Sequence, residues 1–95
     1  MIINNLLLKL KDRSPENITK SRGVLLSMQG KIEELVDLKV EVNVRPGASA
    51  YDILLIAKYE SMADFEAYLV HPVHVEVGKY IANVLESSAA VCYES

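Results

Sequence analysis

The stretch IINNLLLKLK, residues 2–11, decides the fold that we expect for this chain. Successive side chains of a strand point to opposite faces of its sheet. One face of this stretch carries Ile2, Asn4, Leu6, Leu8 and Leu10, and the other carries Ile3 and Leu7. Apolar residues on both faces predict a central strand that is covered on both sides.

Two further strands follow, and they differ in character. Residues 51–59 carry Ile53, Leu55, Ala57 and Tyr59 on one face and Leu54 and Ile56 on the other, so this strand is also apolar on both faces. Residues 38–45 instead alternate strictly between apolar and polar or charged side chains. That alternation is typical of a half-buried strand at the edge of a sheet. The turn-forming residues 46–49 join the two.

A helix is predicted between the first two of these strands. Ser14 before Pro15 is the pairing of an N-cap residue with a proline in the first helical turn. An apolar stripe continues this helix to near Gly30 and consists of Ile18, Leu25, Met28 and Ile32.

A shorter helix begins after Ser61, and Pro72 ends or kinks it. A further helical stretch covers residues 73–85, with a stripe of His74, Val77, Gly78, Ile81 and Leu85. Residues 88–93 are predicted to form the closing strand.

The order strand, helix, strand, strand, helix, strand predicts an α+β fold. It is a ferredoxin-like βαββαβ protomer with a four-stranded antiparallel sheet and its helices on one face. A chain of 95 residues is long enough for one domain, residues 1–95, and too short for two. The second apolar face of the central strands needs a cover, and no helix remains to supply it. A second copy of the sheet is the simplest source, so we expect a homodimer packed sheet to sheet.

Composition excludes several classes of partner. The net charge is −3 and the basic residues are not clustered, which argues against nucleic acid. No apolar run approaches the ~18 residues of a membrane-spanning helix, and the N-terminal segment lacks the features of a signal peptide. Cys92 is the only cysteine, so no disulfide forms within the chain. We therefore expect a cytoplasmic protein in which Cys92 is a small buried residue rather than a nucleophile.

Both histidines lie in one segment, YLVHPVHVEVG, residues 68–78. His74 falls on the apolar stripe of its helix and is predicted to point inward, where Tyr68 can reach the same space. An imidazole beside a phenol is a candidate pair for proton transfer. The alternative is a core histidine bonded to a backbone carbonyl, with Tyr68 serving only for packing, and residue type alone favours it.

No metal or cofactor is expected. His71, His74 and Glu76 do not have the spacing of a zinc site, and the chain has no glycine-rich phosphate loop. Asn4 on the inner face of the first strand is unusual, because a buried amide needs hydrogen-bond partners. It is satisfied by backbone groups or it helps to line a pocket.

These residues resemble those of a known family. The first strand ending in Lys9-Leu10-Lys11-Asp12, the pair Tyr51-Asp52, the pair Glu60-Ser61 and the run Tyr68-x-x-His71-Pro72-x-His74-x-x-x-Gly78 are similar to stress-responsive A/B barrel domain proteins. The resemblance covers nearly the whole chain. It implies a ferredoxin-like protomer and a dimeric α/β barrel, most members of which have no assigned activity.

The resemblance also implies a site. In olivetolic acid cyclase, a plant member that closes a linear polyketide by aldol chemistry, a histidine base and an assisting tyrosine match His74 and Tyr68. Asn4 stands where that enzyme has a further pocket histidine, and an amide does not shuttle protons at neutral pH. Family resemblance therefore leaves the reaction open.

Two functions follow as expectations. The first is a homodimer that binds a small apolar ligand between helices and sheet without catalysis. The alternative is a cofactor-free cyclase, lyase or monooxygenase-like enzyme on a polyketide or quinol-type compound, with His74 as base and Tyr68 as assistant. The expected ligand-binding residues are Asn4, Leu6, Leu8, His71, Val77, Gly78 and Ile81, although the place of His71 beside Pro72 also favours a structural role.

Overall fold

A computed structural model describes residues 1–95 of the chain. The strands are β1 (Ile2–Leu10), β2 (Asp37–Val42), β3 (Ile53–Tyr59) and β4 (Leu85–Glu94). The helices are α1 (Pro15–Leu26), α2 (Met62–Leu69) and α3 (Pro72–Val84).

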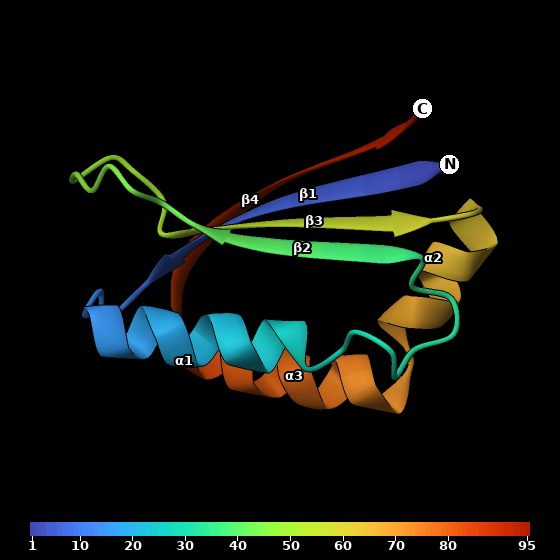
Figure 1. The fold of residues 1–95 in the computed structure, drawn as a ribbon, viewed down its shortest axis with the longest axis horizontal. Helices are drawn as coiled ribbons and strands as arrows, with labels where there is room; N and C mark the ends of the chain where they lie inside the picture. The colour runs from blue at the N-terminus through green and yellow to red at the C-terminus, as the bar shows by residue number, and fades with distance from the viewer.

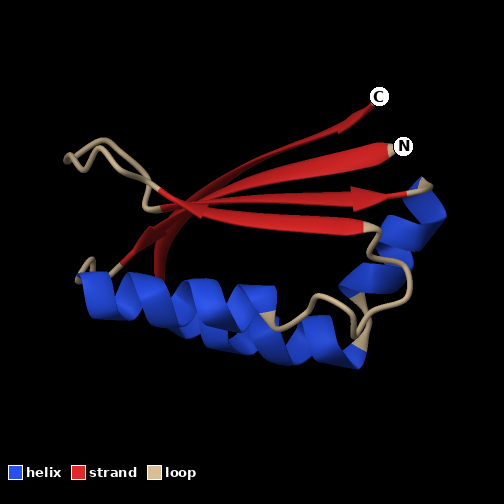
Figure 2. Ribbon diagram, viewed as in Figure 1, coloured by secondary structure: helices blue, strands red, loops and turns tan.

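The four strands form one antiparallel sheet in the order β2-β3-β1-β4. The sequence-based prediction is thus confirmed: β1 and β3 are central and β2 lies at an edge. Helices α1 and α3 run along one side of the sheet, and α2 lies beside the end of β3 and leads to that same side (Figures 1 and 2). This is the predicted ferredoxin-like α+β arrangement, with its second helical region divided into α2 and α3 before Pro72.

The core lies between the sheet and the helices. The predicted inner faces of β1 and β3 are confirmed, since their alternate residues are buried together: Ile2, Leu8, Leu10, Ile53, Leu55, Ala57 and Tyr59. From the helical side, Leu25 and Ile81 are buried against them.

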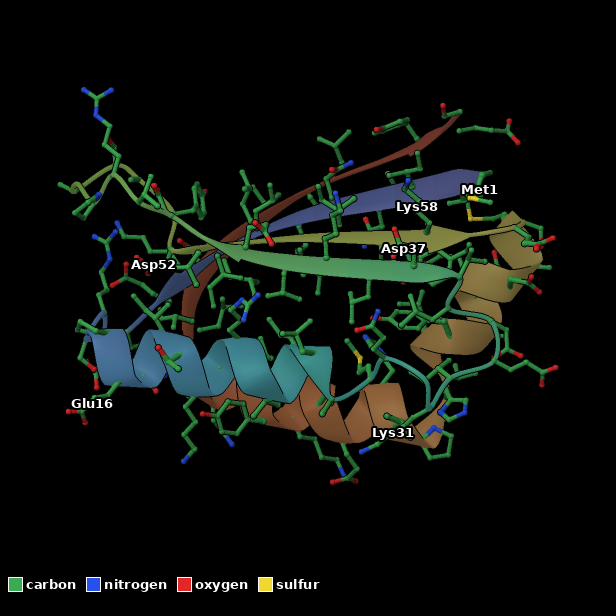
Figure 3. All side chains as sticks on the ribbon, in the orientation of Figure 1. Met1, Glu16, Lys31, Asp37, Asp52 and Lys58 are labelled. Atoms are coloured by element: carbon green, nitrogen blue, oxygen red, sulfur yellow. The ribbon has the colours of Figure 1, made fainter.

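The opposite, outer face of the sheet is apolar along its centre. β1, β3 and β4 contribute Ile3, Leu7, Leu54, Ile56, Val91 and Tyr93 to it. Toward the β2 edge the face becomes charged, and Figure 3 shows Asp37 and Lys58, which pair across β2 and β3, on this side. No helix of the chain covers this face (Figure 1).

Helix α1 is shorter than its apolar stripe predicts. It ends at Leu26, and the following turns pass through Gly30, whose φ of +80° favours glycine. Met28 and Ile32 are nevertheless buried. The two residues match the helical spacing in the sequence, but they reach the core from turns that follow the helix.

β2 and β3 are also shorter than predicted, because the chain leaves the ladder at Asn43. The Asn43 side chain accepts a hydrogen bond from the Arg45 amide and donates one to the Tyr51 carbonyl, which begins a loop in place of the predicted strand. Val44, which continues the alternation in the sequence, is 96% exposed.

Asp52 holds this loop to the end of β1, a contact that we did not predict. Its carboxylate accepts from the Leu10 amide at 2.9 Å and from Arg13 Nε at 3.0 Å. The Arg13 guanidinium also donates to the carbonyls of Gly47 and Ala50. Figure 3 shows Asp52 where the loop meets the sheet.

β4 begins directly at the end of α3 and is longer than the predicted 88–93. Cys92 is exposed in the single chain, so the prediction that it is buried is wrong. It pairs with Asn4 and therefore shares the inner face, but the helices cover only the start of β4.

Candidate functional site

A cavity of about 290 Å³ lies between the inner face of the sheet and the helices. Seven of the nine residues predicted for the site line it: Asn4, Leu6, Tyr68, His74, Val77, Gly78 and Ile81. Leu8 and His71 are not among its lining residues. A cavity of this size is at the lower end of the range for small-molecule sites.

His74 lies in the first turn of α3 and lines the cavity. Its Nδ1 lies 3.0 Å from the carbonyl oxygen of Leu69, at the end of α2. A carbonyl only accepts, so a neutral imidazole must carry its proton on Nδ1 to make this bond. The lone pair of Nε2 is then free to accept a proton or a hydrogen bond.

Tyr68 comes from α2 and is almost fully buried. Its ring centroid is 4.3 Å from that of His74 and 4.9 Å from that of Tyr59. Its hydroxyl donates to Met28 Sδ at 3.6 Å rather than to His74. Burial raises the pKa of the Tyr68 phenol above its ordinary value of 10.0. The phenol is therefore protonated at neutral pH, where it can donate a hydrogen bond but cannot act as a base.

His71 has a structural task. It is the N-cap residue of α3, and its Nδ1 accepts a hydrogen bond from the Val73 amide at 3.1 Å. Pro72 supplies the first helical position, where a missing N–H costs nothing. Leu8 is 1% exposed and belongs to the packed core beside the cavity.

Asn4 extends from β1 into the same space and is half-buried. Its side chain makes no hydrogen bond within the chain. The adjacent Asn5 points to the outer face and donates to the Val91 carbonyl. Of the two explanations for Asn4 open from the sequence, the structure favours the one in which it lines a pocket.

Sequence reasoning missed six further lining residues: Leu25, Met28, Leu55, Leu69, Ala82 and Leu85. Most of them were predicted to face the core, and the pattern does not reveal where a core contains a void. Met28 was the hardest to find, because it reaches the cavity from a turn beyond α1.

The lining contains no Asp, Glu, Lys or Arg, so the site is apolar with a few neutral polar groups. No three His, Cys, Asp or Glu side chains gather in the chain as metal ligands would. None of the three helices has the length and apolar character needed to cross a membrane.

Comparison with known proteins places this geometry in context. The family model of the stress responsive A/B barrel domain matches residues 5–95. No curated protein matches the sequence.

Solved structures resemble the chain over nearly its whole length. A dimeric ferredoxin-like protein of unknown function from Bacteroides fragilis is 28% identical, with a TM-score of 0.84 over 99% of this chain and 95% of that one. A similar dimeric protein from Thermobifida fusca is 24% identical, with a TM-score of 0.86 over 99% and 90%. A hydroxynitrile lyase from Passiflora edulis is 18% identical, with a TM-score of 0.83 over 97% and 90%; like the Thermobifida fusca protein, it is evidence for the shared fold alone.

Proposed function

Because this chain belongs to the stress responsive A/B barrel domain family, we propose that it is a homodimeric binding protein for a small, largely apolar molecule. The observation that carries the proposal is the cavity of about 290 Å³ beside His74 and Tyr68. An engineered apolar cavity of ~150 Å³ in another protein holds benzene, so this one accommodates a ligand of roughly twelve non-hydrogen atoms.

Gly78 provides a sharp test of ligand binding. It lines the cavity, and a β-carbon built on it meets nothing within 4 Å. In Gly78→Leu the added side chain is expected to extend into the cavity and take up space that a ligand needs. We expect n-propylbenzene to raise the melting temperature of the wild type and to leave that of Gly78→Leu unchanged. Equal shifts in both proteins would count against binding in this cavity.

Gly23 offers a matched control, since it is also a helical glycine with open space around it but does not line the cavity. Gly23→Leu is expected to bind n-propylbenzene as the wild type does. The pair thus separates filling of the cavity from a general effect of replacing glycine in a helix.

The homodimer is supported by the outer face of the sheet. Its apolar centre, with Val91 65% exposed, is of the kind that a second sheet covers. The Bacteroides fragilis protein, which is 28% identical, is dimeric. We expect light scattering at micromolar concentration to give twice the chain mass, and Leu54→Lys to reduce it to a single chain. A monomeric wild type would refute this part of the proposal. The cytoplasmic location stays a prediction.

A cofactor-free enzyme is the second candidate, and one contact favours it. The bond from His74 Nδ1 to Leu69 fixes the tautomer that leaves Nε2 as a base beside the cavity. Such a base can remove a proton next to a carbonyl group, as a cyclase, a lyase or a monooxygenase-like reaction on a polyketide or quinol-type compound requires. Tyr68 would assist as a neutral donor once its hydroxyl leaves Met28.

Hydrogen exchange tests this chemistry without knowledge of the substrate. In D₂O, a base at His74 is expected to speed exchange of the α-protons of phenylacetone, followed by NMR. His74→Gln should lose roughly 10²- to 10⁴-fold of that acceleration. Exchange at the uncatalysed rate in the wild type would leave binding as the function.

A further inference from the structure

Asn4 is a polar side chain without a partner on a mostly apolar wall. A primary amide carries two N–H donors and a carbonyl acceptor. An amide in a low-dielectric space loses its hydrogen bonds to water, and within an apolar wall only a bound ligand can replace them. Leu6, the next residue on the same face, is apolar, as are most other lining residues. Because Asn4 is only half-buried, solvent can reach its amide in the free protein, and a ligand that fills the cavity has to replace those bonds to water.

The strand register places Asn4 on the side of the sheet that leads toward Tyr68 and His74. Asn4 follows Ile2 on the inner face, and Ile2 pairs with Tyr59. The Tyr59 ring contacts Tyr68, which in turn contacts His74. Asn4 thus lies toward the side of the cavity that carries Tyr68 and His74. Toward the opposite end the lining is apolar, with Leu85, which pairs with Leu10 at the far end of β1.

The charge of the lining limits the ligand. With no Asp, Glu, Lys or Arg in the wall, an ionised ligand would lose its hydration and meet no permanently charged side chain of opposite sign. The ligand that fits is therefore neutral, and its polar group must complement two side chains. His74 Nε2 requires a donor, and the Asn4 amide pairs best with a group that offers both a donor and an acceptor.

We propose that the cavity recognises a neutral carboxamide-like group, a donor and an acceptor side by side, on an apolar body. This rests on the proposed function, because it assumes that the cavity binds a ligand. The carboxamide N–H groups donate to His74 Nε2 and to the Asn4 carbonyl, and its oxygen accepts from the Asn4 amide. The apolar body lies toward Leu6, Ile81 and Leu85.

Three probes of similar size test the inference by calorimetric titration: 2-phenylacetamide, phenylacetate and n-propylbenzene. We expect the wild type to bind the amide about tenfold more tightly than the hydrocarbon, as the net effect of its three hydrogen bonds after the amide leaves water, and to bind the anion most weakly. Asn4→Leu removes two of the three bonds, so it should lose most of this preference and keep its affinity for n-propylbenzene. Asn4→Val serves the same purpose if Asn4→Leu does not fold.

Asn83→Leu is the matched control, because it changes the same residue type at an exposed position of α3 that does not line the cavity. Its amide preference should equal that of the wild type. If n-propylbenzene binds but the amide has no advantage, or if Asn4→Leu keeps that advantage, the carboxamide inference is overturned while the binding function stands. If none of the probes binds the wild type, and n-propylbenzene leaves its melting temperature unchanged, the proposed function itself fails.

Discussion

Tyr68 and His74 meet through their rings, with centroids 4.3 Å apart and planes tilted by 42°. The tyrosine hydroxyl lies on Met28 Sδ instead, and the imidazole is bonded to the Leu69 carbonyl. The two residues therefore share a cavity wall without sharing a hydrogen bond. Proton transfer from the phenol toward a ligand would require the weak bond to the thioether to break first.

This arrangement predicts that the Tyr68 hydroxyl contributes little to stability. Tyr68→Phe keeps the ring and removes a bond to sulfur, a weak acceptor. We expect the free energy of unfolding, measured with urea, to change by less than about 1 kcal/mol. Tyr68→Ala should cost about 3–5 kcal/mol, because it removes a buried ring. Similar losses in the two variants would show that the hydroxyl has a partner beyond Met28.

Tyr59 carries a buried hydroxyl with no hydrogen-bond partner. Phenylalanine fills nearly the same space without the unsatisfied polar group. Tyr59→Phe is therefore expected to raise the free energy of unfolding by about 1 kcal/mol at pH 7. A loss of stability would indicate a hydrogen-bond partner on this oxygen, such as the neighbouring Tyr68 hydroxyl, an ordered water or a ligand group.

The same residue gives a pH dependence. Burial raises the pKa of Tyr59 above its ordinary value of 10.0. Below pH 10 both folded and unfolded chains hold the proton; above it, only the unfolded chain releases it, so stability falls as pH rises. Urea titrations from pH 8 to 11 should show a wild-type slope steeper than that of Tyr59→Phe by up to ~1.4 kcal/mol per pH unit above 10. Parallel curves would contradict the shift.

His71 is expected to act on stability through its capping bond. His71→Ala removes the acceptor for the Val73 amide and should cost about 1 kcal/mol, whereas His71→Asn, a good N-cap residue, should cost less. Ligand affinity should be equal in both variants once they are folded, since His71 does not line the cavity. If His71→Ala selectively lost n-propylbenzene binding, His71 would have to contribute to the binding site, and this prediction would be wrong.

The apolar pattern of the strands predicted the fold well, because burial of one or both faces of a strand directly determines which of its positions are apolar. Leu8 and Leu54 lie on the faces that their positions in the strands predict. The same reasoning failed for Val44, since the side-chain bonds of Asn43 end β2 before the apolar alternation stops. It also missed Asp52, whose partners Leu10 and Arg13 are about 40 residues away in sequence. Polar contacts between residues that are distant in sequence produce no periodic pattern from which they could be predicted.

The site was predictable to the extent that its residues share one face. Val77 and Ile81 follow from the stripe of α3, and Asn4 from the inner face of β1. Leu8 has the same pattern and yet packs solidly, because the position of a void depends on how side chains from several elements fit together. His71 does not line the cavity despite its proximity in sequence, since its ring turns back to cap the helix that it begins.

The Asp52 contacts predict a costly substitution away from the cavity. Asp52→Ala leaves the Leu10 amide without its acceptor and Arg13 without its carboxylate. Because the arginine is partly exposed, we expect a loss of about 2–3 kcal/mol, less than a fully buried pair would give. Urea unfolding measures it, with Glu60→Ala as the control at an exposed carboxylate that forms no ion pair. Equal effects in the two variants would mean that Asp52 does not hold the loop to β1, and that the order of residues 43–52 comes from the Asn43 turn alone.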